Sequence, residues 1–248
     1  MPELTPRHLV IVRHGESEGD VRRAFRREGK AYESQKHPAD ERQTELGNEQ
    51  SIAAGKWIAS YVLENYGIRS FDTYVTSPMV RTKQSAVSLG LSQEWKEDPL
   101  LTERDRGKVQ GLTRSEHRSL YPESYEQMNM YPFHWVPPDG ESILKVAGRA
   151  ARFIEQFKTR RNILVETHRD WMWAAHIPLD GMSIDEALAV DTDEIHNGQI
   201  LHYTNVDPQD RRVYGDSFRW KRSVCPWVSD AEVIEASCQW IEIGTISK

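Results

Sequence analysis

The sequence predicts an α/β fold with a mostly parallel central sheet. Short runs of branched apolar residues alternate along the chain with longer segments whose apolar residues recur at helical spacing. Several short runs, such as 8–12, are apolar throughout, which is typical of strands buried in a parallel sheet. A length of 248 residues is sufficient for one large domain with its own core.

The first elements follow from this pattern. Residues 8–12 (HLVIV) are a predicted strand, whereas the polar and charged segment 20–45 has no clear period, so we interpret it as an excursion from the core. Apolar residues recur at helical spacing over 46–66, and Gly67 indicates the end of that helix. Residues 71–76 (FDTYVT) alternate and are rich in β-formers, which predicts a second strand.

A further helix is expected directly after the second strand. Ser77 suits its N-cap and Pro78 its first helical position, and the helix should run to about Leu89. The stretch 95–140 has little regular pattern beyond a short helix at 113–120.

The rest of the chain completes the alternation. An apolar stripe predicts a helix over about 141–157, and 162–167 (NILVET) is a third strand. The later elements are two short helices, two strands joined by a turn and a weakly helical tail, at 171–176, 184–190, 199–204, 213–222 and 229–242. Because ligands bind beyond the carboxyl ends of parallel strands, residues that follow the first three strands should converge.

Composition excludes several classes of function. The chain has 32 Lys and Arg against 38 Asp and Glu, a net charge of −6, which argues against a general nucleic-acid-binding surface. Its two cysteines, Cys225 and Cys238, provide no disulfide framework and match no zinc motif. No apolar run approaches the ~20 residues of a membrane span, and the N-terminus lacks a secretion signal. We therefore expect a cytoplasmic protein without membrane contact.

Two histidines and three arginines follow the three predicted strands. Arg13 and His14 directly follow the first strand, and Arg81 lies one helical turn after the second. His168 and Arg169 follow the third. A guanidinium group makes two parallel hydrogen bonds to phosphate, and an imidazole can act as a nucleophile. A lone histidine after a strand is more often structural, but the joint pattern predicts an oxyanion pocket that contains an imidazole.

Four ordered motifs resemble the histidine phosphatase superfamily, in the branch of cofactor-dependent phosphoglycerate mutases and related phosphatases (branch 1). They are RHGES at 13–17, S-P-x-x-R at 77–81, L-x-E-R-x-x-G at 101–107 and the second histidine, His168. The resemblance covers about residues 8–204. It implies a three-layer sandwich with helices flanking the sheet. It also implies a single domain over 1–248, with an insertion at about 20–45 and a C-terminal extension after about 205.

The resemblance implies a role for each motif residue. His14 is expected to accept the phosphoryl group as a phosphohistidine, and Glu103 to protonate the leaving oxygen. Arg13, Arg81 and His168 would hold the phosphate and stabilise the transferring group, because this reaction depends on positioning and on charge stabilisation. We expect burial to raise the pKa of Glu103. Without the other motifs, Glu103 would be interpreted as a helix-capping or solvent-facing carboxylate. The resemblance implies no cofactor and no metal.

Two positions depart from the family pattern. Asp20 stands where members typically have asparagine. It could contact substrate hydroxyls, turn away, or pair with a neighbouring arginine, Arg22, Arg23 or Arg26. Arg169 replaces the usual glycine and either contacts the substrate or forms an outward salt bridge.

Two further features remain open at this level. Ser17, beside the nucleophile, is a candidate substrate contact that either orients His14 or shapes the turn. The segment 22–30 (RRAFRREGK) is either a solvated stretch or a basic flap for a substrate with more than one anionic group.

The spacing of the motifs favours hydrolysis. The stretch between Glu103 and 140–142 is shorter than in the glycolytic mutases that the chain resembles, where it helps enclose the substrate. The resemblance therefore implies an open pocket where water can reach a phosphohistidine. We therefore expect a phosphatase acting on a small phosphorylated substrate. The alternatives are a phosphoglycerate mutase-type phosphotransferase and a non-catalytic member that binds phosphorylated ligands.

Overall fold

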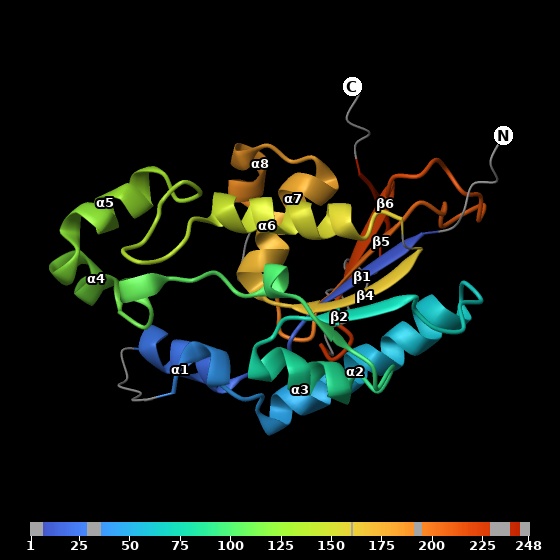
Figure 1. The fold of residues 1–248 in the computed structure, drawn as a ribbon, viewed down its shortest axis with the longest axis horizontal. Coiled ribbons are helices and arrows are strands. Elements are labelled where there is room, and N and C mark those ends of the chain that lie inside the picture. Colours follow the sequence, from blue (N-terminus) through green and yellow to red (C-terminus); the bar gives the residue numbers. More distant parts are fainter. Residues whose placement is uncertain (1–6, 29–35, 160, 191–194, 229–238, 244–248) are drawn as a thin grey trace.

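A central sheet with helices on both sides organises the molecule (Figure 1). The structure is a computed structural model that describes residues 7–28, 36–159, 161–190, 195–228 and 239–243. Within these residues the sheet has seven strands in the order β3-β2-β4-β1-β5-β6-β7. They are β1 (His8–Arg13), β2 (Thr73–Thr76), β3 (Lys96–Glu97), β4 (Asn162–Thr167), β5 (Ile200–Thr204), β6 (Trp220–Val224) and β7 (Ile241–Glu242).

The sheet is mainly parallel, which confirms the expected α/β fold. β1 to β4 run in one direction, β5 pairs antiparallel with β1, and β6 pairs antiparallel with β5. β6 is therefore parallel to β1, and within the described sheet only β5 and the short β7 run in the opposite direction. The carboxyl ends of β1, β2 and β4 consequently lie at one edge.

Helices cover the two faces of the sheet and one of its edges. One face carries α2 (Glu45–Ile58), its π-helical continuation Ala59–Glu64, and α3 (Val80–Ser88). The other carries α6 (Ile143–Gln156), α7 (Arg169–Asp180) and α8 (Ile184–Ala189). Three helices and three 3-10 turns lie in the connections: α1 (Glu18–Arg27), α4 (Arg114–Leu120), α5 (Pro122–Met130), Pro38–Asp40, Pro99–Leu101 and Gly107–Val109. No helix in the described parts of the chain is long and apolar enough to cross a membrane; the cytoplasmic location stays a prediction.

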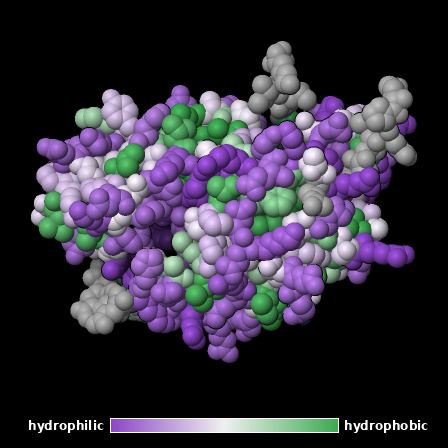
Figure 2. Space-filling model, viewed as in Figure 1, coloured by the Kyte–Doolittle hydropathy of each residue, from purple (hydrophilic) through white to green (hydrophobic). Residues whose placement is uncertain are grey.

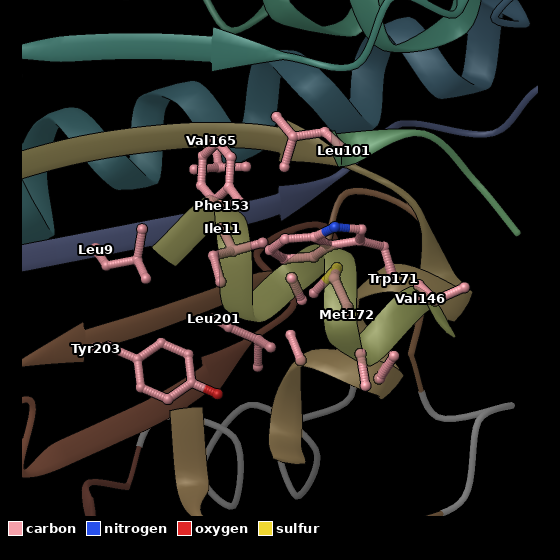
Figure 3. Packing of buried hydrophobic residues seen from close by; sticks show 14 of the residues in the cluster. Leu9, Ile11, Leu101, Val146, Phe153, Val165, Trp171, Met172, Leu201 and Tyr203 are labelled. Carbon is pink, nitrogen blue, oxygen red and sulfur yellow. The ribbon is translucent and has the colours of Figure 1, made fainter. Parts of the chain in front are cut away.

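Alternation along the buried strands divides the core into two layers. Leu9 and Ile11 of β1 belong to the cluster under α6 and α7, whereas Val10 and Val12 belong to the cluster under α2. Figure 3 shows side chains of the first cluster, with Trp171 of α7 beside the sheet. Both faces of β1 are fully covered, which explains why its sequence is apolar throughout rather than alternating.

Several expected elements are confirmed and others are corrected. β1, β4, α4 and α6 lie within two residues of their predicted bounds. The expected strand at 213–222 is shorter, since β6 begins only at Trp220. Of the tail 229–242, residues 229–238 lie outside the described residues and 241–242 form β7 rather than helix.

Two sequence interpretations were wrong for physical reasons. The segment 20–45 contains most of α1, whose helical period is carried by charged side chains, so an apolar stripe could not reveal it. Ser77 does not cap α3, because that helix begins at Val80, after Met79. The Ser77 hydroxyl instead bonds to His168. α5, in the stretch that looked irregular, has no described buried residue and therefore no stripe.

Candidate active site

The residues that follow β1, β2 and β4 converge on one cavity of about 840 Å³. His14, Arg81 and Glu103 line it, together with Asp20 and Arg169. Figure 2 shows a hollow surrounded by hydrophilic residues at the side of the molecule where α1 lies. The predicted convergence of polar side chains at this edge of the sheet is therefore confirmed for these residues, whereas Arg13 and His168 do not line this cavity.

His14 is held as a neutral imidazole with a defined tautomer. Its side chain is 3% exposed, and Nδ1 lies 2.7 Å from the carbonyl oxygen of Gly15. Because a carbonyl only accepts, Nδ1 carries the proton and Nε2 the lone pair. Burial lowers the pKa of His14 to about 3, and Arg81 and Arg13 act in the same direction, whereas Asp20 opposes them. The imidazole is therefore neutral over the physiological range of pH.

Arg81 joins the two histidines. Its Nε donates to His14 Nε2 at 3.2 Å, and its Nη2 donates to His168 Nδ1 at 3.2 Å. The carbonyl oxygen of Pro38 accepts from Nη1 at 2.6 Å, so the segment between α1 and α2 also fixes this guanidinium. His168 then carries its proton on Nε2, which donates to Ser77 Oγ at 2.9 Å. Burial, followed by Arg81, holds the pKa of His168 well below its usual value.

Arg13 lies behind Asp20 rather than on the large cavity. It lines a neighbouring cavity of about 430 Å³ and donates to Asp20 Oδ1 at 2.7 Å. Burial alone would raise the pKa of Asp20, but Arg13 and the Ser17 hydrogen bond help hold it well below the usual range. Of the arginines that the sequence offered as partners, only Arg23 lies near Asp20, at 3.5 Å. The main partner is Arg13, which sequence reasoning did not consider; Arg22 pairs with Glu41 instead.

Ser17 shapes the turn after the nucleophile. It is the N-cap of α1, where its hydroxyl donates to Asp20 Oδ2 at 2.7 Å and accepts from the Asp20 N–H. Its proton is used in this capping box, yet Ser17 also lines the cavity, so its role as a substrate contact stays a prediction. Asn197, which precedes β5, donates to the carbonyl oxygen of His14 and to Asp20 Oδ2. Its only sequence signal is its position before the strand that pairs with β1.

Two carboxyl groups at the cavity are driven toward opposite protonation states. Burial, and next the negative charge of Asp170, raise the pKa of Glu103, as the sequence had led us to expect for burial. Burial would also raise the pKa of Asp170, but Arg106 at 2.8 Å and Arg169 at 3.2 Å hold it far below its usual value. The two pKa shifts have opposite signs, an arrangement suited to acid–base work. Sequence reasoning missed Asp170, although it directly follows Arg169.

Arginines dominate the rest of the cavity wall. Arg169 faces the cavity and its Nε bonds to the buried Asp170, so its salt bridge is not the outward one that the sequence left open, and its contact with substrate stays a prediction. The others on the wall besides Arg81 are Arg22, Arg23, Arg26, Arg27, Arg104, Arg106 and Arg114. Of the basic segment 22–30, residues 29–30 lie outside the described residues. Among the described residues no group of three or more His, Cys, Asp or Glu could hold a metal ion.

Comparison with known proteins assigns the family. The sequence profile of the histidine phosphatase superfamily (branch 1) matches residues 9–212. The chain belongs to this superfamily. Within it, the chain is 28% identical over 209 residues to a 2,3-bisphosphoglycerate-dependent phosphoglycerate mutase of Bartonella henselae, covering 80% of this chain and 92% of that one. It is 30% identical over 171 residues to human 6-phosphofructo-2-kinase/fructose-2,6-bisphosphatase 1, which covers 67% of this chain but only 31% of that longer protein.

Solved structures of the superfamily share the fold. The α-ribazole phosphatase of Shigella flexneri superposes with a TM-score of 0.60 at 21% identity, over 85% of this chain and 97% of its own. A mycobacterial glucosyl-3-phosphoglycerate phosphatase gives a TM-score of 0.61 at 21% identity, over 87% and 97%. Members of the superfamily related to this chain thus include both phosphatases and mutases.

Proposed function

We propose that this member of the superfamily hydrolyses a small phosphomonoester through a phosphohistidine on His14, without a metal ion. The observation that carries the proposal is the state of His14. The Gly15 carbonyl fixes its proton on Nδ1, and the lone pair of Nε2 lies beside Arg81 in a deep polar cavity. A neutral, oriented imidazole next to a guanidinium group is what attack on a phosphoryl group requires.

The first chemical step forms the phosphohistidine. His14 Nε2 attacks phosphorus as the bond from phosphorus to the ester oxygen breaks. Glu103 gives its proton to that oxygen, which leaves as an alcohol, and the raised pKa of Glu103 keeps this proton available. The phosphoryl oxygens take over hydrogen bonds from Arg81, whose positive charge offsets the charge that gathers on them.

The second step returns the enzyme to its starting state. Water attacks phosphorus, the bond from phosphorus to His14 Nε2 breaks, and inorganic phosphate leaves. Glu103, now a carboxylate, takes the proton from the attacking water and is thereby reset as the acid. The cavity of about 840 Å³ has room for this water beside a bound phosphoryl group.

The arginine-lined wall supports a substrate that carries a second anionic group. On the cavity wall Arg23 pairs with Asp20 and Arg106 pairs with Asp170, and the side chains of these two arginines are 42% and 38% exposed. Guanidinium groups at such partly exposed positions can still exchange water for a phosphate or carboxylate. We therefore propose that Arg23 and Arg106 bind the second anionic group of the substrate. Comparing kcat/KM for a monophosphate with that for the corresponding bisphosphate tests this point.

A phosphomutase is the second candidate, because the curated relatives that cover most of both chains are phosphoglycerate mutases. In that reaction the phosphohistidine would return its phosphoryl group to another hydroxyl of the substrate instead of to water. The two reactions share the first step. They differ in whether inorganic phosphate or an isomerised ester is the product.

The test compares wild type with His14→Ala on an alkyl phosphate panel, with His134→Ala as control because His134 is exposed and away from the cavity. We expect His14→Ala to lose roughly a thousandfold or more in kcat, His134→Ala to lose nothing, and a chelator to have no effect. Acid-labile phosphate should appear on wild type and not on His14→Ala. Equal rates for wild type and His14→Ala would overturn the proposal, and isomerisation without release of inorganic phosphate would establish the mutase.

A further inference from the structure

A second cavity opens at the opposite edge of the sheet, where β1 and β4 begin. Its volume is about 500 Å³, and His8 and Asn162, the first residues of these two strands, line it. The same strands end beside His14 and His168, so the length of the sheet separates this cavity from the candidate active site (Figure 1). No residue is common to the described linings of the two cavities.

The cavity is strongly positive. Arg69, Arg161 and Arg211 line it, and no Asp or Glu appears among its described lining residues. The candidate active site differs, because carboxylates alternate with its arginines. Three guanidinium groups around one hollow without a counter-charge in its wall favour an anion from solution.

Arg211 is held over the cavity at a backbone cost. Its φ of 65° lies in the left-handed region, which a residue with a side chain adopts rarely. The side chain donates to Asn65 Oδ1 at 2.8 Å, and its guanidinium lies 4.6 Å from the centre of the Tyr66 ring. The position of this charge is therefore fixed by its surroundings.

A chain of hydrogen bonds decides which nitrogen of His8 carries the proton. The Arg222 guanidinium lies over the rings of Trp57 and Trp240. Its Nη2 is 3.4 Å from Nδ1 of His202. Arginine only donates, so neutral His202 carries its proton on Nε2, which lies 3.0 Å from Nδ1 of His8. Nδ1 of His8 must then accept, and the proton of His8 lies on Nε2. Burial, and next Arg222, lower the pKa of His8 to about 3, in keeping with a neutral ring.

This Nε2–H donor has no acceptor. The His8 side chain is 1% exposed, and neither its Nε2 nor Oδ1 of Asn162 has a hydrogen-bond partner within the described structure. The Tyr66 ring also lines the cavity, with its centre 4.4 Å from the centre of the His8 imidazole. A ligand that moves this ring aside could supply an acceptor oxygen to His8 and a hydroxyl to Asn162. A hydrogen phosphate group carries both, together with the charge that the arginines favour.

We propose that this cavity is a second phosphate site, which binds inorganic phosphate or the phosphate group of a monoester among His8, Asn162 and the three arginines. Phosphate takes two parallel hydrogen bonds from a guanidinium group, and it offers the hydroxyl that a carboxylate lacks. The site performs no chemistry and is independent of the function proposed above.

Equilibrium dialysis with labelled inorganic phosphate tests the proposal. The variant Arg69→Ala with Arg161→Ala removes two side chains that make no hydrogen bond or ion pair within the described residues, so the fold should tolerate it. The control, Arg118→Ala with Arg152→Ala, removes the same charge from exposed positions elsewhere. Arg81→Ala weakens the first site.

We expect two phosphates per wild-type chain and per control chain, and one per chain of the Arg69→Ala, Arg161→Ala variant. The Arg81→Ala variant should keep the second site. If an unlabelled phosphomonoester displaces the labelled phosphate from this variant, the site also binds esters. If it does not, the site is limited to inorganic phosphate. No loss of phosphate from the Arg69→Ala, Arg161→Ala variant relative to wild type, or equal losses in the variant and its control, would overturn the proposal. Failure of the proposed function would instead leave phosphate at the second site and abolish only the hydrolysis that depends on His14.

Discussion

Asp20 places a negative charge at the edge of a cavity that we propose binds phosphate. It accepts from Arg13 at 2.7 Å and lines the cavity on its other side, so it separates Arg13 from an anion bound there. Arg13 also has a buried Nε without a partner within the described residues. The guanidinium is thus only partly satisfied by the protein, and the carboxylate limits how far an anion can use the rest.

Removal of this charge should strengthen phosphate binding. In Asp20→Asn the amide oxygen can still cap α1 at Ser17, while the repulsion of the anion disappears. We expect the KM and the inhibition constant of inorganic phosphate to fall roughly tenfold, which corresponds to about 1.4 kcal/mol. Asp185→Asn, at an exposed position on α8, is the control. Unchanged or weaker inhibition by phosphate in Asp20→Asn would contradict this account.

Asp170 should set the alkaline limit of activity. Glu103 must be protonated to act as the acid, so activity is present below its pKa and is lost as the pH rises through it. Asp170 raises that pKa, and in Asp170→Asn the charges of Arg106 and Arg169 would lower it further. The alkaline limb of kcat/KM should therefore move to lower pH, while the acid limb from His14, with its pKa of about 3, stays in place.

An alkyl phosphate is the correct substrate for this measurement, because its poor leaving group requires the proton of Glu103. The Asp185→Asn variant should keep the wild-type profile. An alkaline limb that stays in place or moves to higher pH in Asp170→Asn would show that Asp170 does not raise the pKa of Glu103.

At this scale the sequence could predict the residue types but not their partners. His14, Arg81, Glu103 and Arg169 line one cavity because each follows a strand or a motif that leads to the same edge. The pairing of Asp20 with Arg13 was not visible, since it depends on how α1 turns back after its cap. Side-chain pairing is a tertiary property that one sequence does not encode locally.

Elements with an apolar stripe were predictable, and elements without one were not. α6 and β4 bury apolar side chains against the sheet, so their periods are visible in the sequence. α1 and α5 lie over the cavity and the surface, where charged and polar residues carry the helical period. The helix that borders the candidate active site was therefore the hardest to predict.

The start of α2 touches the backbone of the nucleophile loop. A Cβ at Gly47 would lie 2.1 Å from the carbonyl oxygen of Glu16, so only glycine permits this approach. Gly55, two turns along the same helix, has an equivalent contact with Leu89 of the loop after α3, away from the cavity. An added Cβ would meet a backbone carbonyl oxygen at a similar distance at both glycines, but only Gly47 adjoins the loop that contains His14.

Gly47→Ala should therefore reduce catalysis, and Gly55→Ala should not. Overpacking at either contact costs about 1–3 kcal/mol of unfolding free energy, measured by urea denaturation. Only Gly47→Ala displaces the peptide that holds His14 Nδ1, and we expect its kcat per folded molecule to fall roughly tenfold or more. Equal kcat values for the two variants would show that α2 does not position the nucleophile loop.

The whole molecule combines an acidic average with a basic cavity. The net charge is −6, yet Arg23, Arg26 and Arg106 line the same cavity. The average argues against extended nucleic acid as a ligand, but a small anion responds to the nearby charges. Within about 10 Å, the Debye length at 0.1 M salt, the arginines should dominate the potential.

The dependence of kcat/KM on salt distinguishes the local charge from the average. If the net charge of −6 governed the encounter, added salt would screen a repulsion and kcat/KM for an anionic substrate would rise. We expect the reverse, a fall of several-fold between about 0.02 and 0.5 M salt, because salt screens the attraction of the cavity arginines. Arg23→Ala should flatten this slope, since it removes one of those charges, whereas Arg118→Ala on exposed α4 should leave it unchanged. Stopped-flow or steady-state measurements at constant pH give the slopes, and a kcat/KM that rises with salt would show that the arginine wall does not attract the substrate.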